Sequence, residues 1–242
     1  MVLSFPGNGL GWDDPRTLKY MYDYIIFDLD GTLSDSAVGL VRSINHSLRY
    51  HGYAEHPIND LIQYFGPPID QTFINLTASS DKLHIDSLVN IFRERYSIVG
   101  FSENILYDGI EAALQILYQS GIKLGVCTSK RSDFAEKVLN LFGLRRYFQF
   151  VCGGDIGIQK WQQLEGLLRK KIITLNSIMV GDRDVDVTAA HKNEIDSAGV
   201  LWGYGDLAEL SANNPKFIFN FPAELTKLIS NHHERIDHSA YF

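Results

Sequence analysis

The chain has 242 residues, of which 45% are apolar and 21% are charged, and its formal net charge is −7. This length and composition predict a folded protein with one large domain, or one domain with a smaller insertion, and exclude disorder of the whole chain. The acidic balance provides no basic surface for nucleic acid, so we expect no nucleic-acid partner.

The sequence shows no targeting or anchoring segment. No apolar run approaches the roughly 18 to 20 residues that a membrane span needs, and the N-terminus lacks the charged start and apolar core of a signal peptide. Cys127 and Cys152 are too few for a disulfide framework and are expected to be buried in a reducing compartment. We therefore expect no membrane partner and a cytoplasmic location.

The chain begins with an irregular stretch and a short strand. Residues 1–22 are rich in glycine, proline and aspartate and are predicted to form an irregular lead-in. The first predicted strand, YIIFDLD over residues 24–30, is apolar until it reaches two carboxylates, Asp28 and Asp30. Two like charges at the end of a buried strand repel each other. This placement calls for a cation or a substrate that makes it tolerable.

The next segment is predicted to be helical. About 90 residues separate the first strand from the second, too many for one crossover connection, and they contain no convincing strand. They contain apolar residues at helical spacing instead. The first run is Val38, Val41, Ile44 and Leu48, and the second is Ile85, Leu88, Val89, Phe92, Tyr96 and Val99. We predict a small all-helical domain inserted at residues 36–107, standing over the acidic turn.

Short apolar strands alternate with helical patterns over the rest of the chain. The predicted strands are 123–129, 148–154, 177–182, 199–203 and 216–220. Apolar runs of this kind suit a sheet that is covered on both faces, so we predict an α/β fold with a doubly wound, mostly parallel sheet and an inserted all-helical cap domain. The core domain would comprise residues 23–35 and 108–230, and residues 231–242 would form a C-terminal tail.

Polar side chains also follow the later strands, at the edge of a parallel sheet where ligands bind. They are Thr128, Ser129 and Lys130 after the second strand, Lys160 after the third, and Asp182 and Asp186 after the fourth. Carboxylates placed together favour a hard cation, and carboxylate, carbonyl and water oxygens are the ligands of Mg²⁺. Mg²⁺ with few protein ligands keeps positions open for phosphate oxygens, so the pattern predicts a small phosphorylated metabolite as substrate.

Each of these features has a simpler interpretation when it is taken alone. DLDGT could be a surface turn, Thr128 and Ser129 could cap a helix, and Lys160 could be a solvated lysine. A calcium-binding EF-hand fails, because that loop needs glycine at its sixth position and glutamate at its twelfth, where this chain has Leu33 and Gly39. The joint placement of the residues at one edge favours a functional site.

With these residues assembled, the chain resembles the haloacid-dehalogenase-like hydrolase superfamily, and within it the phosphoglycolate-phosphatase-like branch. The resemblance covers roughly residues 22–230. Its four motifs are FDLDGTL (27–33), TSK (128–130), Lys160 and GDRDVD (181–186). The first and the last are specific at this spacing, and a lone lysine is the least specific.

The resemblance implies a role for each acidic residue. Asp28 would be the nucleophile that forms an aspartyl-phosphate, and Asp30 would be the general acid and then the general base. Mg²⁺ would be held by the carboxylates of Asp28 and Asp182 and by the backbone carbonyl of Asp30. Asp186 would act through a metal-bound water or by orienting Lys160.

The resemblance also implies how substrate is bound. Thr128, Ser129 and Lys160 would contact the phosphorylated substrate, and Lys130 competes with Lys160 for the role of phosphate-binding lysine. Gly66 and Pro67 lie where this branch places its substrate-specificity loop, although an ordinary inter-helix turn is an equal interpretation. The helical cap would close over the site and exclude bulk water.

The pattern as a whole predicts a Mg²⁺-dependent phosphatase that acts on a small phosphomonoester, phosphoglycolate-like or a nucleoside 5′-monophosphate. A phosphomutase on a sugar phosphate stays open, because it shares the motifs and differs in how long the aspartyl-phosphate survives. A catalytically silent phosphate-binding regulator is a weaker alternative, because neither Asp28 nor Asp30 is replaced. A phospho-receiver domain is about half this size and carries its phosphorylated Asp on a later strand. Monomer and small homo-oligomer are both open.

Overall fold

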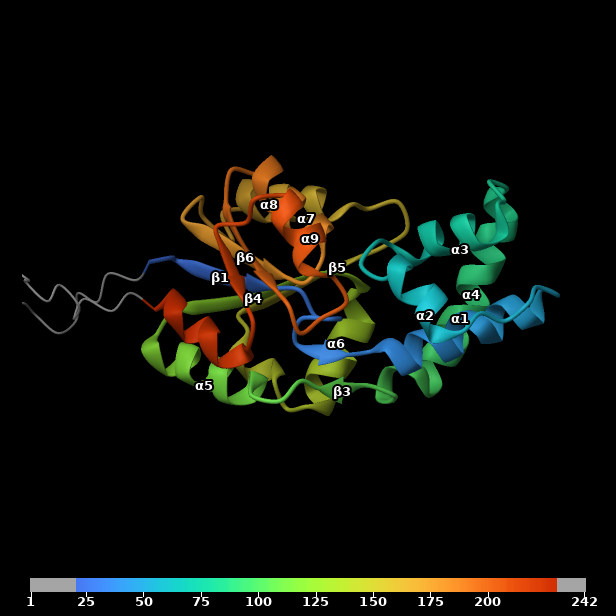
Figure 1. Ribbon diagram of the computed structural model, residues 1–242, viewed down its shortest axis with the longest axis horizontal. Coiled ribbons are helices and arrows are strands. Elements are labelled where there is room, and N and C mark those ends of the chain that lie inside the picture. The colour runs from blue at the N-terminus through green and yellow to red at the C-terminus, as the bar shows by residue number, and fades with distance from the viewer. Residues whose placement is uncertain (1–20, 230–242) are drawn as a thin grey trace, which may run out of the picture.

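The structure of the protein is a computed structural model that describes residues 21–229 (Figure 1). The predicted C-terminal tail and all but the last two residues of the predicted lead-in lie outside this range. In the described part, no helix is both long and apolar enough to cross a bilayer.

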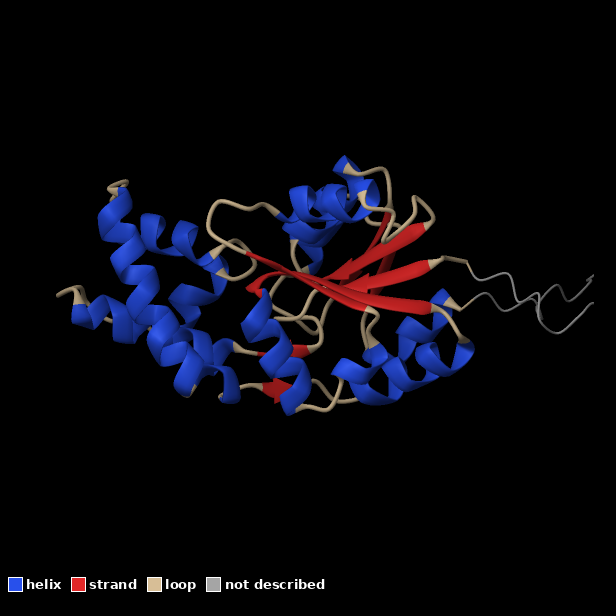
Figure 2. Cartoon of the chain, turned by 180° about the vertical axis from the view of Figure 1, so that it is seen from behind, coloured by secondary structure: helices blue, strands red, loops and turns tan. Residues whose placement is uncertain are grey.

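The centre of the molecule is a six-stranded sheet in the order β5-β4-β1-β6-β7-β8, with every neighbouring pair parallel. The strands are β1 (Tyr24–Phe27), β4 (Lys123–Arg131), β5 (Phe150–Gly154), β6 (Ser177–Gly181), β7 (Asp196–Val200) and β8 (Phe217–Phe219). Figure 2 shows the strands fanning out as one twisted layer between helices. The predicted α/β fold with a parallel sheet is confirmed.

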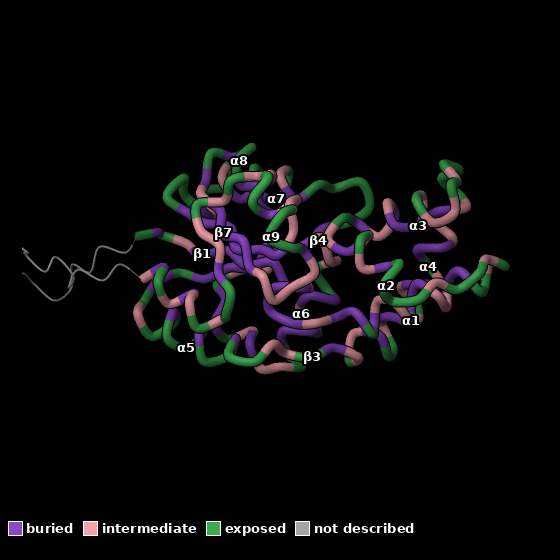
Figure 3. Tube along the Cα trace, viewed as in Figure 1, coloured by how far each residue is buried: buried purple, intermediate pink, exposed green. Residues whose placement is uncertain are grey.

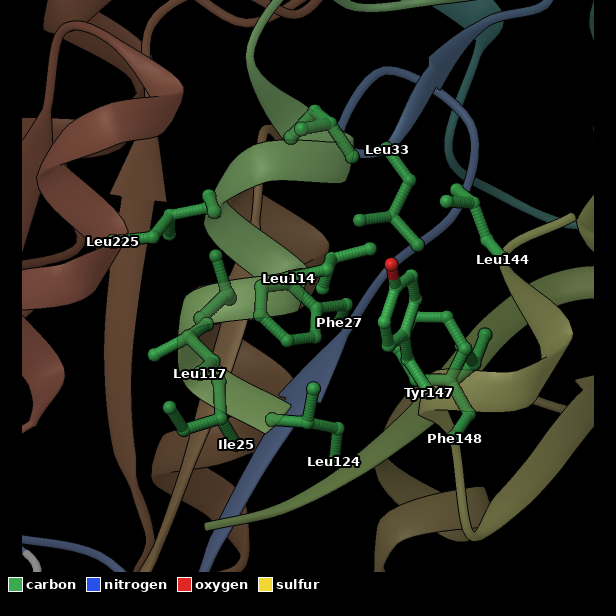
Figure 4. Close-up of a cluster of buried hydrophobic side chains, with 14 of the residues drawn as sticks. Ile25, Phe27, Leu33, Leu114, Leu117, Leu124, Leu144, Tyr147, Phe148 and Leu225 are labelled. Carbon is green, nitrogen blue, oxygen red and sulfur yellow. The ribbon is translucent and has the colours of Figure 1, made fainter. Parts of the chain in front are cut away.

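Helices cover both faces of the sheet because successive side chains of a strand point to opposite sides. Ile25 and Phe27 of β1 pack into one hydrophobic cluster, and Ile26 between them packs into another. The first cluster includes α5 (Ile110–Ser120), α6 (Ser132–Leu141), η3 (Arg145–Tyr147) and η4 (Pro222–Leu228), and Figure 4 shows part of it. The second includes α7 (Lys160–Arg169) and α8 (Asp184–Lys192). A short helix, α9 (Leu207–Ala212), precedes β8.

The helices between the first two long strands form a separate cluster beside the sheet, which we call the helical cap, residues 37–102 (Figure 1). They are α1 (Ala37–Tyr50), α2 (Ile58–Leu61), η1 (Ile62–Tyr64), α3 (Ile69–Thr77), α4 (Lys82–Ile98) and η2 (Gly100–Ser102). Their apolar faces make a hydrophobic cluster that also includes Phe134 of α6. Figure 3 shows that the inner parts of the cap are buried and the outer parts exposed. The domain boundaries given above stay a prediction.

Three details differ from the sequence prediction. Two-residue strands, β2 (Ser34–Asp35) and β3 (Ile105–Leu106), pair antiparallel at the base of the cap. No strand was predicted there, because two residues are too few to show an alternation of apolar and polar side chains. The strand predicted at 199–203 lies at 196–200 and begins with a charged residue, Asp196. The Asp196 carboxylate accepts hydrogen bonds from Tyr22 and Lys216, which allows a charged residue at the start of the strand. The strand predicted at 24–30 ends at Phe27, because the chain then turns.

The topology places the polar strand ends together. β1 lies between β4 and β6, with Phe27 in register with Val126 and Val180. The residues that follow these positions therefore meet at one edge of the sheet, which is the edge where parallel sheets bind ligands. The helical cap lies over this edge (Figure 1).

Candidate active site

Asp28 lies at the centre of the site. It follows β1, its backbone N–H donates to the Val180 carbonyl over 2.9 Å, and the residue is 3% exposed. The Lys160 ammonium, at the start of α7, lies 2.9 Å from Asp28 Oδ2 and also contacts the Asp186 carboxylate. The other Asp28 oxygen, Oδ1, is buried and accepts no hydrogen bond from any described residue. One oxygen of Asp28 is thus held and the other is left for a further ligand.

Asp28, Asp182 and Asp186 form a buried cluster in which one ligand atom from each lies within 4.8 Å of the others. Asp182 is held from two sides, because its Oδ1 accepts from Thr32 Oγ1 over 3.0 Å and its Oδ2 accepts from the Tyr204 N–H over 2.9 Å. The Asp30 side chain is not part of this cluster. This agrees with the resemblance, which implies the backbone carbonyl of Asp30 and not its carboxylate as the metal ligand.

Gly31 allows the turn after β1 to pass close to this cluster. Its φ is +83°, a backbone angle that residues other than glycine rarely adopt, and a Cβ built on it would lie 2.1 Å from Asp182 Oδ2. Both facts require glycine at this position. The glycine of the DLDG sequence is therefore part of the site and not only a turn residue.

The charges of the cluster are not balanced by protein groups. Burial raises the pKa of Asp182, and the nearby carboxylates of Asp186 and Asp28 raise it further. Burial also raises the pKa of Asp186, although Lys160 opposes this shift. Burial alone would lower the pKa of Lys160, but Asp186 and Asp28 outweigh it and raise the pKa, so the ammonium stays charged. Buried carboxylates facing a single ammonium, with an unpartnered oxygen on Asp28, fit a divalent cation of the hard, oxygen-binding kind.

Thr128 and Ser129 lie near the end of β4, which is the strand beside β1, and the strand is two residues longer than predicted. Thr128 is 2% exposed, and its carbonyl accepts from Gln163 Nε2 over 3.0 Å. Neither residue caps the next helix, because β4 continues to Arg131 and α6 begins at Ser132. The Thr128 hydroxyl oxygen accepts from the Lys130 N–H over 3.3 Å and keeps its own proton to donate to a ligand at this edge.

Lys130 and Lys160 occupy different places in the site. Lys130 Nζ lies 2.8 Å from Asp30 Oδ2, whereas Lys160 contacts Asp28 and Asp186. Of the two lysines, Lys160 is the one beside the expected nucleophile. The placement favours Lys160 over its competitor as the phosphate-binding lysine.

A pocket that is partly open to solvent lies between the sheet edge and the cap. Asp28, Asp30, Thr128, Ser129 and Lys130 line it from the sheet. From the cap, the lining residues are mostly apolar or aromatic, and they are Leu40, Ile44, Tyr64, Phe65, Gly66, Pro67, Pro68, Ile69, Thr72, Phe92, Arg93 and Tyr96. The predicted loop residues Gly66 and Pro67 are therefore brought together with the predicted catalytic residues.

The profile of the family described as "Haloacid dehalogenase-like hydrolase" matches residues 25–200. The chain belongs to this family. It is therefore an enzyme of the haloacid dehalogenase-like hydrolases, and the resemblance inferred from the motifs is confirmed.

Several characterised proteins are similar to this hydrolase. A 5′-nucleotidase from Pseudomonas aeruginosa is 33% identical over 90% of this chain and 100% of its own. A phosphoglycolate phosphatase from Agrobacterium fabrum is 35% identical over 85% of this chain and 93% of its own. The tyrosine-protein kinase PtkA of Mycobacterium tuberculosis is 36% identical over 75% of this chain, which spans 62% of the kinase.

A solved structure has a similar fold. The crystal structure of a predicted phosphatase from Clostridium acetobutylicum is 34% identical to this hydrolase, with a TM-score of 0.81 over 85% of this chain and 97% of that one. The fold of this chain thus has a counterpart in a solved structure.

Sequence reasoning missed the residues that join the cap to the core of this hydrolase. The Arg183 guanidinium donates to the backbone carbonyls of Ile62 and Phe65 in the cap, and Glu209 Oε1 accepts from its Nε over 2.7 Å. The Tyr204 hydroxyl accepts from the Ser36 N–H over 2.9 Å. Arg183 lies inside the GDRDVD motif and Tyr204 lies in the segment GVLWGYG (199–205), but neither stretch indicates which cap residue is its partner.

Proposed function

We propose that this hydrolase is a Mg²⁺-dependent phosphatase that cleaves small phosphomonoesters through an aspartyl-phosphate on Asp28. The observation that carries the proposal is the state of Asp28. Its carboxylate is buried at the floor of a pocket, with Oδ2 bound to Lys160 and Oδ1 without a partner among the described residues. A buried carboxylate held in this way is prepared to attack an electrophile that enters the pocket.

The chain's own residues supply the steps. One oxygen of the Asp28 carboxylate attacks phosphorus, a bond from phosphorus to Asp28 forms, and the bond to the leaving oxygen breaks. Asp30, which lines the pocket, gives its proton to that oxygen, then takes a proton from water, and the resulting hydroxide releases phosphate from Asp28. Lys160 and Thr128 hold the phosphoryl oxygens, and Asp186 orients Lys160 through their direct contact.

The metal would be Mg²⁺, held by Asp28 and Asp182 and by the backbone carbonyl of Asp30. When bound, it supplies positive charge that offsets the repulsion between the carboxylates and a phosphate dianion. The raised pKa values of Asp182 and Asp186 support this assignment, because they indicate carboxylates that need a counter-charge.

The pocket supports a nucleoside 5′-monophosphate as the first substrate to test, ahead of phosphoglycolate. Aromatic residues such as Tyr64 and Phe92 line it from the cap and could cover a sugar and a base. A glycolate carboxylate would need an unpaired cation, whereas the three cations that line the pocket are paired. Arg93 is bound to Asp155 over 2.7 Å, Arg131 to Asp133 over 2.7 Å and Lys130 to Asp30 over 2.8 Å. The likeness to a 5′-nucleotidase supports the same order, and the likeness to a phosphoglycolate phosphatase keeps the second substrate in the test.

The test is phosphate release from a panel of nucleoside 5′-monophosphates, phosphoglycolate, sugar phosphates and p-nitrophenyl phosphate, with Mg²⁺ or with EDTA. We expect turnover that requires Mg²⁺ and is lost in Asp28→Asn. Asp23→Asn is the matched control, because Asp23 is exposed near the opposite end of the same strand and should keep full activity. No release from any ester by folded, Mg²⁺-loaded protein would overturn the proposal. Conversion of one sugar phosphate into its isomer would identify a phosphomutase instead.

A further inference from the structure

Lys130 is a buried ammonium whose partners come from both parts of the molecule. Its side chain is 5% exposed, and its Nζ lies 2.8 Å from Asp30 Oδ2. The same nitrogen donates a hydrogen bond to the Tyr96 hydroxyl and lies 4.4 Å from the centre of the Tyr96 ring.

This contact makes the two oxygens of Asp30 different. Oδ2 is bound by the ammonium, whereas Oδ1 is buried and has no hydrogen-bond partner among the described residues. Asp30 also lines the pocket. A carboxylate that is held by one oxygen presents the other in a fixed direction, which proton transfer to a leaving oxygen requires.

The third partner connects this arrangement to the cap. Tyr96 lies on α4, is 1% exposed, and is fixed between Phe92, at a ring-centroid distance of 5.4 Å, and Phe134 of the core, at 5.1 Å. A run of direct contacts therefore leads from the cap helix through Lys130 to Asp30. Lys130 has its full set of partners only when the cap lies over the sheet edge.

We propose that Lys130 is a positioning residue for Asp30, and that Tyr96 makes this positioning depend on the cap. The proposal rests on the proposed function, since it assigns Asp30 to proton transfer. It gives Lys130 a role that differs from phosphate binding, which is left to Lys160.

The test compares substrates with different leaving groups. A residue that positions the proton donor should matter only for a leaving group that must be protonated. p-Nitrophenolate is a good leaving group that needs no proton, whereas an alkoxide must be protonated as it departs. For Lys130→Met we expect kcat/KM to fall on the order of 100-fold with the best alkyl ester of the panel and by no more than about threefold with p-nitrophenyl phosphate. Lys130→Arg should recover most of the loss, and Tyr96→Phe should show a smaller loss of the same kind.

Two controls keep the result interpretable. Lys123→Met removes an exposed lysine at the other end of the same strand and should change neither rate. In an Asp30→Asn background, Lys130→Met should cause no further loss with the alkyl ester, because both substitutions remove the same function. An equal loss with both esters, or no loss in Lys130→Met, would overturn the proposal.

A crystal structure of Lys130→Met separates this proposal from the proposed function, because it needs no turnover. We expect the Asp30 carboxylate to rotate or to lose its defined orientation in the variant. An unchanged Asp30 would contradict the positioning role even if the wild type proved inactive. Turnover by wild type together with an unchanged Asp30 would leave the phosphatase proposal intact and reject only the role of Lys130.

Discussion

At the scale of single residues, the site depends on close approaches that only certain residue types permit. Gly31 lets the turn after β1 reach Asp182, and Thr32, the next residue, holds the Asp182 carboxylate. Gly31 and Thr32 of the DLDGT sequence therefore help to position Asp182 in the carboxylate cluster. Lys160 beside Asp28 and Lys130 beside Asp30 offset part of the repulsion between the two carboxylates that follow β1.

Gly31→Ala tests this explanation, with Gly52→Ala as its control. Both glycines have a positive φ, +83° and +81°, but a Cβ at Gly31 would meet Asp182, whereas one at Gly52 would meet nothing within 4 Å. Gly52→Ala should lower the free energy of unfolding by about 1 kcal/mol and keep its activity. Gly31→Ala should lose more stability and on the order of 100-fold in kcat, because Asp182 is displaced. Equal stability and activity in the two variants, measured by denaturant unfolding and phosphate release, would contradict the account.

The raised pKa values of Asp182 and Asp186 predict how pH affects the metal-free protein. A carboxyl whose pKa is higher in the folded state than in the unfolded state stabilises the fold at low pH, and this contribution is lost as pH rises through the folded-state pKa. Lys160 stays protonated across this range and does not reverse the sign. The Tm in EDTA should therefore fall as pH rises from about 4, the ordinary carboxyl range, toward neutral.

Mg²⁺ should reverse this trend, because it binds the deprotonated carboxylates. The increase in Tm that Mg²⁺ causes should be larger at neutral pH than at pH 5, and Asp182→Asn should abolish it. Differential scanning fluorimetry of wild type and variant, across pH with and without Mg²⁺, measures both effects. An Mg²⁺ effect that is constant over pH would contradict a site built from these carboxylates.

At the scale of elements, the cap is joined to the core by a small number of polar contacts. Arg183 directly follows Asp182 of the buried carboxylate cluster. Its side chain reaches the carbonyls of Ile62 and Phe65, next to the predicted specificity loop. Gly66 packs against the same side chain, since a Cβ on it would lie 3.2 Å from the Arg183 Cγ. The loop that lines the substrate pocket is therefore held by the segment that carries Asp182.

Arg183→Gln should loosen the cap while leaving the carboxylate cluster in place, because the backbone N–H of Arg183 that donates to Asp186 is retained. We expect amide hydrogen exchange to become faster over residues 62–66 and KM to rise by about three- to tenfold with a smaller change in kcat. Arg49→Gln is the control, because Arg49 forms an exposed ion pair with Glu55 within the cap. Unchanged exchange and KM in Arg183→Gln would show that the contact does not hold the cap.

At the scale of the whole molecule, the sequence predicts the parts that repeat a local pattern. Apolar runs predict the parallel sheet, and helical spacing predicts α1 and α4, although Val38 proves exposed and the helix face turns toward Ile44 and Leu48 instead. The polar strand ends predict which side chains gather at one edge, because the topology of a parallel sheet brings them there.

The remaining features depend on contacts between distant segments, which no local pattern encodes. β2 and β3 are two residues each, and their pairing across the base of the cap exists only once the helices between them have folded. The contact of Lys130 with Tyr96 joins residues 34 positions apart, and those of Arg183 join residues about 120 positions apart. For this reason the sequence named Lys130 as a candidate but placed it at the phosphate and not at Asp30.

The central claim is that Asp28 carries the phosphoryl group during turnover, and peptide mass spectrometry after an acid quench tests it most directly. Wild-type protein quenched during turnover of its best substrate with Mg²⁺ should yield a phosphorylated peptide with the modification on Asp28, and Asp28→Asn should yield none. An Asp30→Asn variant should accumulate more of this species, because water is no longer activated to release it. Rapid phosphate release with an unmodified Asp28 in all samples, or modification of another residue, would contradict the account.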